Sequence, residues 1–147
     1  MHEVSFEEAL VLIRAKDPRY ACEAYLFIKD ALDHTQKVIV KKSRGRPRHV
    51  SGQELLAGIR EFALSQYGPM TMMLLQEWGV KNCRDFGEMV FNMVEIGWLA
   101  KTETDTREDF EGGYDFFEAF QKPFLPTSKL AAKKADPVPE PTTEAGL

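Results

Sequence analysis

Residues that commonly perform catalysis or bind metals are few and scattered in this sequence. The three histidines are His2, His34 and His49, and the two cysteines are Cys22 and Cys83. None of them has the spacing of a zinc site or a redox dithiol, and no phosphate-binding, nucleophile-elbow or dinucleotide-binding motif is present. We therefore predict a protein that is not an enzyme and that uses no metal, cofactor or small-molecule substrate.

One acidic cluster, Asp105, Glu108 and Asp109, comes closest to a metal site. It lacks the ligand spacing and the glycine of a calcium-binding loop, so the cluster predicts a solvated turn. Asp85 and Glu88 are spaced one helical turn apart, which favours a polar helix face over an acid–base pair.

The net charge of −4 is distributed unevenly along the 147 residues. Residues 37–49 hold six basic side chains and no acidic one, whereas residues 50–124 hold thirteen acidic and six basic ones. The N-terminal residues do not resemble a secretory signal, and no apolar run reaches the length of a membrane span. We expect a cytoplasmic protein without a membrane segment, with both cysteines as buried free thiols.

Helical periodicity and capping signals dominate the chain. Ser5–Glu8 and Ser51–Glu54 have the pattern of capping boxes, and Asp17 and Asn82 are candidate N-caps. Helices are predicted over 6–15, 18–36, 52–67, 69–78 and 83–96, with a last helical turn near 116–120. The fold class is mainly α, in one domain over 1–124, followed by a disordered tail over 125–147 that is rich in proline and lacks aromatic residues.

The order of elements over 51–117 predicts a winged-helix-like core. Two helices joined by a turn at Gly79 form a helix-turn-helix, with Val80 filling the angle between them. Residues 98–104 alternate like a strand, and 110–116 form either its partner in a short C-terminal β-hairpin or an aromatic loop. The alternative is a generic helical bundle with a trailing hairpin.

The outer face of this core is too acidic for the usual way in which such folds bind DNA. Arg84 is its only cation, and carboxylates that face phosphates oppose binding. The preferred function is therefore a non-catalytic interaction module that docks a protein partner or a second copy of itself. The candidate docking residues are Arg84, Asp85, Glu88, Asn92, Trp98, Phe110 and Tyr114.

A basic loop predicted to be mobile, over 37–50, supports the alternative function. Arg44-Gly45-Arg46-Pro47 resembles an AT-hook, whose extended chain inserts arginines into the narrow minor groove of A·T-rich DNA. The other interpretations are contact with an acidic surface and a solvated loop without a specific role. Val38–Val40 within it form either a short strand or the last turn of the preceding helix. The candidate nucleic-acid-binding residues are Lys41, Lys42, Arg44, Arg46 and Arg48.

Several phrases of the sequence together resemble a bacterial protein family described as restricted to planctomycetes and verrucomicrobia. The resemblance covers about residues 4–124, and the phrases are 17–20 (DPRY), 24–27 (AYLF), 48–56 (RHVSGQELL), 68–70 (GPM), 85–92 (DFGEMVFN), 101–105 (KTETD) and 108–110 (EDF). The family has no assigned activity or catalytic residues, so the resemblance implies a cytoplasmic bacterial protein and no function. The Arg44–Pro47 phrase is not part of the family pattern, which makes a family-wide DNA role less expected.

Overall fold

The computed structural model describes residues 5–46 and 48–126, and every regular element in them is helical. The mainly α fold class is therefore confirmed. The elements are α1 (Phe6–Lys16), α2 (Cys22–Lys42), α3 (Gly52–Tyr67), η1 (Gly68–Met70), α4 (Thr71–Glu77), α5 (Cys83–Glu95), η2 (Arg107–Phe110), α6 (Phe116–Phe120) and η3 (Lys122–Phe124), where η denotes a 3₁₀-helix.

Local capping signals set the beginnings of α1, α3 and α5 as predicted. The Ser5 and Ser51 hydroxyls accept the amide protons of Glu8 and Glu54, whose carboxylates in turn accept from the serine amides. Asn82 caps α5 by accepting from the amide of Asp85. These contacts satisfy amide groups that have no partner inside the helix.

Helix α2 begins later and ends later than the sequence indicates. Asp17 does not cap it, because the Asp17 carboxylate accepts the amide proton of Arg19 and closes a turn over 17–20. At the other end the helix continues to Lys42, so the predicted loop over 37–50 is wrong for 37–42. Ile39 is buried in this stretch, and lysines are favourable near a helix C-terminus. Of the two predictions for Val38–Val40, the helical one is confirmed.

Helices α4 and α5 are joined by the predicted turn. Gly79 has a φ of +87°, which only glycine adopts readily, and Val80 is completely buried in the angle. The Trp78 carbonyl accepts the amide proton of Ala21, so the turn is fastened to the segment between α1 and α2.

The predicted C-terminal hairpin over 98–116 is wrong. The amides of Trp98 and Leu99 both donate to the Met93 carbonyl and finish the end of α5, so they have no strand partner. Residues 102–105 form a turn, and the following segment forms η2, in which Asp109 accepts the amide proton of Thr106. The last helical turn at 116–120 is confirmed as α6.

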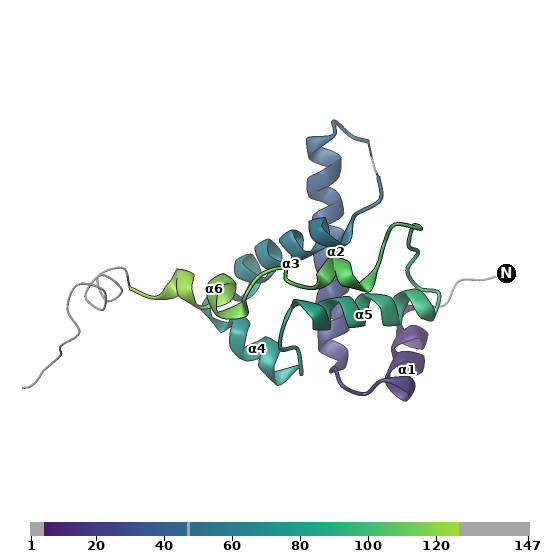
Figure 1. The fold of residues 1–147 in the computed structure, drawn as a ribbon, viewed down its shortest axis with the longest axis horizontal. Helices are drawn as coiled ribbons and strands as arrows, with labels where there is room; N and C mark the ends of the chain where they lie inside the picture. Colours follow the sequence, from purple (N-terminus) through teal and green to yellow (C-terminus); the bar gives the residue numbers. More distant parts are fainter. Residues whose placement is uncertain (1–4, 47, 127–147) are drawn as a thin grey trace, which may run out of the picture.

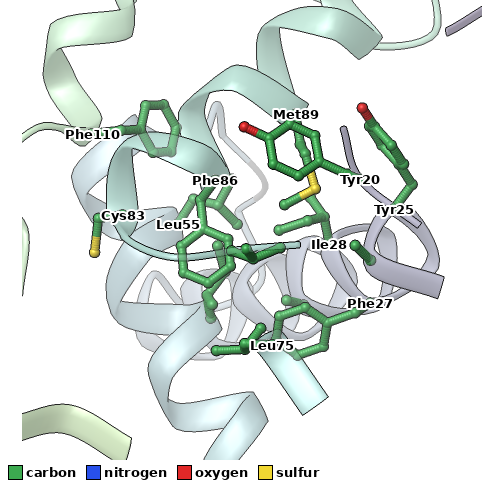
Figure 2. Packing of buried hydrophobic residues seen from close by; sticks show 14 of the residues in the cluster. Tyr20, Tyr25, Phe27, Ile28, Leu55, Leu75, Cys83, Phe86, Met89 and Phe110 are labelled. Atoms are coloured by element: carbon green, nitrogen blue, oxygen red, sulfur yellow. The ribbon is translucent and has the colours of Figure 1, made fainter. Parts of the chain in front are cut away.

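Figure 2 shows the core, in which side chains from α2, α3, α4, α5 and η2 meet. Phe27, Ile28, Leu75 and Phe86 are buried here. The buried ring of Tyr20 is drawn close to Met89 in this view, and its hydroxyl donates to Asp85. Burial of these apolar surfaces is the main force that holds the helices together.

Two further predictions concern the C-terminal tail and the membrane-spanning segments. The tail predicted over 125–147 lies outside the described residues except for Leu125 and Pro126. Among the helices of the described residues, none has both the length and the apolar character needed to span a membrane.

Candidate nucleic-acid interface

The end of α2 and the turn after it form a projection that we call the cationic finger, residues 37–46. Figure 1 shows this end of α2 extending well beyond α3, with the following segment returning beside it. Its exposed basic side chains are Lys37, Lys41, Lys42, Arg44 and Arg46. None of the five takes part in an ion pair with another described residue, so their charges face solvent.

The tip of the cationic finger is a helix-ending turn and not an extended chain. The Gly45 amide donates to the Val40 carbonyl at 2.7 Å, and the Arg44 amide donates to the Lys41 carbonyl at 3.4 Å. This pair of bonds is a Schellman motif, which places Arg44 in the left-handed region with a φ of +59°. The AT-hook prediction relied on extended backbone here, and Arg44 and Gly45 do not have it. Pro47 lies outside the described residues.

Arg44→Gly is expected to raise the free energy of unfolding by about 1 kcal/mol, because a left-handed non-glycine residue costs about 1–2 kcal/mol and the lost helix-end charge returns part of the gain. Urea denaturation followed by circular dichroism measures the change. Arg46→Gly removes an equal charge two residues away without relieving a left-handed residue, so it should not stabilise the protein. Equal effects of the two variants would contradict the strain argument.

The base of the finger is fastened by two side-chain pairs. Arg48 binds Glu54 of α3 through two nitrogen–oxygen contacts, one of 2.9 Å and one of 2.5 Å, and this guanidinium lowers the pKa of Glu54 to about 2. His49 Nε2 lies 2.5 Å from Asp105 Oδ2. Arg48 therefore serves mainly to hold the returning chain, unlike the other predicted nucleic-acid-binding residues Lys41, Lys42, Arg44 and Arg46.

Most of the predicted docking residues on α5 are occupied inside the molecule. The Tyr20 hydroxyl donates to Asp85 at 2.5 Å, and the Asn92 amide donates to Asp17 at 2.9 Å and to the Tyr25 hydroxyl at 3.0 Å. The Arg19 guanidinium, followed by the Asn92 amide, holds the pKa of Asp17 well below its usual range. This face of α5 thus binds the segment between α1 and α2.

Glu88 is the centre of the remaining charges on this face. Its carboxylate lies 2.9 Å from a nitrogen of Arg107, 3.4 Å from Arg19 and 3.9 Å from Arg84. Arg107 also reaches Glu95 at 2.8 Å. Of these arginines, Arg84 is the most exposed, with 68% of its side chain accessible, against 55% for Arg19 and 38% for Arg107. The acidity that the sequence places on an outer face is therefore largely neutralised by arginines from other segments.

The predicted aromatic docking residues are also engaged in packing. Trp98 contacts Phe6 edge to face, with ring centroids 4.9 Å apart. Phe110 is buried against Gly87, and the Tyr114 hydroxyl donates to the Leu56 carbonyl at 2.8 Å. Burial raises the pKa of Tyr114 well above its usual value. The structure thus brings these three residues into the body of the protein, apart from the cationic finger.

A small cavity lies under the base of the finger, between His49 and α5. Its volume is about 110 Å³, and its walls are mainly apolar. Ligand pockets usually measure about 300–1,000 Å³, so this cavity is a weaker candidate site than the surface of the finger. Of the two cysteines, Cys83 is buried as predicted, whereas Cys22 is only half-buried, which corrects the prediction for it. Both are free thiols.

No protein-family model, curated protein or solved structure matches this chain. Lys37 was not among the predicted site residues, although its spacing of four from Lys41 places both on one helix face once the helix is extended. The exposure of Met70, Met73, Phe117 and Phe124 was not predicted either, because residue type alone does not distinguish them from the apolar side chains of the core.

Proposed function

We propose that the chain is a non-catalytic interaction domain that binds nucleic acid through the cationic finger. The observation that carries this proposal is the group of five exposed cations on a projecting helix end, without ion-pair partners in the described chain. Arg19, Arg48 and Arg107 are paired with carboxylates. Other described cations without an ion pair, such as Arg60, Lys81 and Lys101, are far apart in the sequence, whereas the five of the finger lie within residues 37–46.

The geometry of the finger favours contact with phosphates. Lys37 and Lys41 lie one turn apart, about 6 Å along the helix, while Lys42 borders a different groove, between α2 and α3. Positive charge is thus present on two sides of the helix and at its tip. Neutralising phosphates releases counterions, and this release supplies most of the affinity of sequence-independent binding.

Contact with phosphates is a better proposal than an A·T-specific hook. Insertion of Arg44 and Arg46 into a minor groove would require the Schellman turn to open and Arg44 to leave its left-handed conformation. We therefore propose binding to duplexes with little dependence on sequence. The resemblance to the planctomycete and verrucomicrobial family brings no activity that decides between these modes, and a cytoplasmic location remains part of the proposal.

Binding is expected to weaken steeply with salt. If all five cations contact phosphates, the log–log slope of affinity against salt is about −4.5, and the triple variant Lys41→Gln/Lys42→Gln/Arg46→Gln reduces it to about −2. Fluorescence anisotropy with labelled mixed-sequence and A·T-rich duplexes measures both slopes.

The matched control is Lys81→Gln, which removes an exposed lysine from the turn between α4 and α5, away from the finger (Figure 1). It should leave the slope unchanged. An unchanged slope in the triple variant would overturn the proposal. Strong preference for the A·T-rich duplex would favour the hook after all, and binding to acidic protein alone would favour an acidic partner.

Docking of a protein remains the second candidate function. The α5 face predicted from the sequence does not support docking, since Asp85, Glu88 and Asn92 are bound to other residues of the same chain. A different set of side chains supports docking. Met70, Met73, Phe117 and Phe124 are each between 42% and 57% exposed. Large apolar side chains that gather on a surface commonly mark an interaction site.

A further inference from the structure

One groove is lined by residues of η1, α4 and η3 and by the residues on either side of η3, and it includes the exposed side chains of Met73 and Phe124. The groove has a volume of about 380 Å³, and its lining includes Met72, Met73, Gln76, Gln121, Phe124 and Leu125. Met70 precedes Met73 by three residues, and Phe117 precedes Gln121 by four, so each lies on the same side of its segment as a lining residue. We call the groove with these neighbours the methionine–phenylalanine surface.

Charge is missing from the lining of this surface. Its polar groups are the amides of Gln76 and Gln121, and at its edge Lys122 pairs with Glu118 at 3.3 Å. Copies of a chain with a net charge of −4 repel one another, and an uncharged surface is where they approach with the least repulsion. A strongly charged partner would gain nothing from such a lining.

We propose that two copies of the chain pack their methionine–phenylalanine surfaces together in a two-fold dimer. A two-fold interface needs projections and a receiving groove on the same surface. Here the exposed side chains of Met73 and Phe124 line the groove itself, so one surface offers both. Flexible methionine side chains adapt to a facing surface and make favourable sulfur–aromatic contacts.

The chain's own C-terminal residues fit the groove less well. Residues 127–147 contain no aromatic side chain, and Leu130 is flanked by Lys129, Lys133 and Lys134. An uncharged apolar groove is poorly matched to a segment whose few apolar side chains are accompanied by lysines. A second copy instead supplies the same phenylalanine and methionine side chains that the groove itself presents.

The proposed dimer keeps the cationic fingers accessible. Figure 1 shows α4 and α6 on a different side of the molecule from the projecting end of α2, so their pairing leaves both fingers exposed. If the proposed function holds, each dimer presents two fingers, and linking them raises affinity for a duplex that both can reach. Dimerisation itself does not depend on nucleic acid.

Sedimentation equilibrium of the full chain, without nucleic acid, tests the proposal. The expected mass is twice 16.8 kDa at high concentration, falling toward one chain on dilution. Met73→Glu should weaken the dimer at least about tenfold, since it buries a carboxylate in an apolar interface. Val11→Glu is the matched control, because Val11 is 70% exposed on α1, and this change should leave the dimer intact. A monomer at every concentration, or a dimer that Met73→Glu does not weaken, would overturn the proposal.

A photo-crosslinking amino acid at position 73 identifies the occupant directly and does not depend on how Met73→Glu folds. Crosslinks from position 73 to residues of the same surface on a second chain support the dimer. Crosslinks within one chain to residues 127–147 would assign the groove to the C-terminal segment and overturn the proposal. Since no nucleic acid is present, failure here is distinct from failure of the proposed binding function.

Discussion

Replacing Gly58 with alanine is expected to lower the free energy of unfolding by about 3 kcal/mol, because the new methyl group has no room. A Cβ atom at position 58 would lie 1.7 Å from Thr35 Oγ1 and 2.8 Å from Thr35 Cβ. Thr35 is 4% exposed, and its hydroxyl donates to the Ala31 carbonyl at 2.7 Å, so the side chain cannot turn away without losing that bond. Helices α2 and α3 would have to separate.

Urea denaturation of Gly58→Ala, Thr35→Ala and the double variant measures this effect. Thr35→Ala removes Oγ1 and Cγ2 but keeps Cβ, so the double variant should recover part of the stability that Gly58→Ala loses. The two substitutions are then strongly non-additive, as expected for groups in direct contact. Additive losses would show that the close approach of the two helices is not what limits position 58.

The Thr35–Gly58 contact also bears on the proposed binding function, because it lies near the base of the cationic finger. The groove that continues from it toward the finger is bordered by Ile39, Lys42 and Glu54. Moving α2 away from α3 would shift Lys42 relative to the Arg48–Glu54 pair. We therefore expect Gly58→Ala to affect nucleic-acid binding as well as stability, whereas Arg44→Gly changes the tip alone.

Local signals allowed much of the fold to be predicted. Capping at Ser5, Ser51 and Asn82 involves residues three positions apart, so the sequence contains the whole interaction. The ends of α2 were predicted less well because their causes are not periodic. Asp17 has two ways to use its carboxylate, capping a helix or closing a turn, and its contact with Asn92 of α5 is not visible in a local pattern.

The hairpin was predicted wrongly for the same reason, because contacts that decide the structure here are not part of the local pattern. Alternation over 98–104 is typical of a strand, but a strand needs a partner, and the amides of Trp98 and Leu99 are used at the end of α5. Phe110 then packs where Gly87 has no side chain: a Cβ atom there would lie 2.8 Å from Phe110 Cβ. A close approach of this kind depends on tertiary packing that periodicity does not contain.

The candidate site, too, could be predicted where it depends on neighbouring residues and not where it depends on distant ones. The cations of the finger are neighbours in sequence, so charge counting finds them. The acidic face of α5 was misinterpreted because the arginine that contacts Glu88 from the other end of the chain, Arg19, is 69 residues away. A helix wheel shows which side chains share a face, but it does not show which distant segment covers that face.

Gly79→Ala is expected to be among the most destabilising single changes, at about 2–5 kcal/mol. Its φ of +87° alone costs a non-glycine residue about 1–2 kcal/mol. In addition, a Cβ atom would lie 2.5 Å from the backbone oxygen of Arg19, which a rotamer change cannot move, and overpacking of this kind adds about 1–3 kcal/mol. The turn between α4 and α5 would be pushed away from residues 17–20.

Gly97→Ala is the matched control, since Gly97 has a φ of +89° and open space where its Cβ would be. It should lose only the conformational part, about 1–2 kcal/mol. The difference between the two urea-derived free energies then measures how closely the turn between α4 and α5 packs on the segment between α1 and α2. The same packing holds Tyr20 against Asp85 and Arg19 near Glu88. These contacts occupy the polar side chains on this face of α5. Equal losses in the two variants would mean that the face can open, and would return Asp85 and Glu88 to the docking surface that the sequence first indicated.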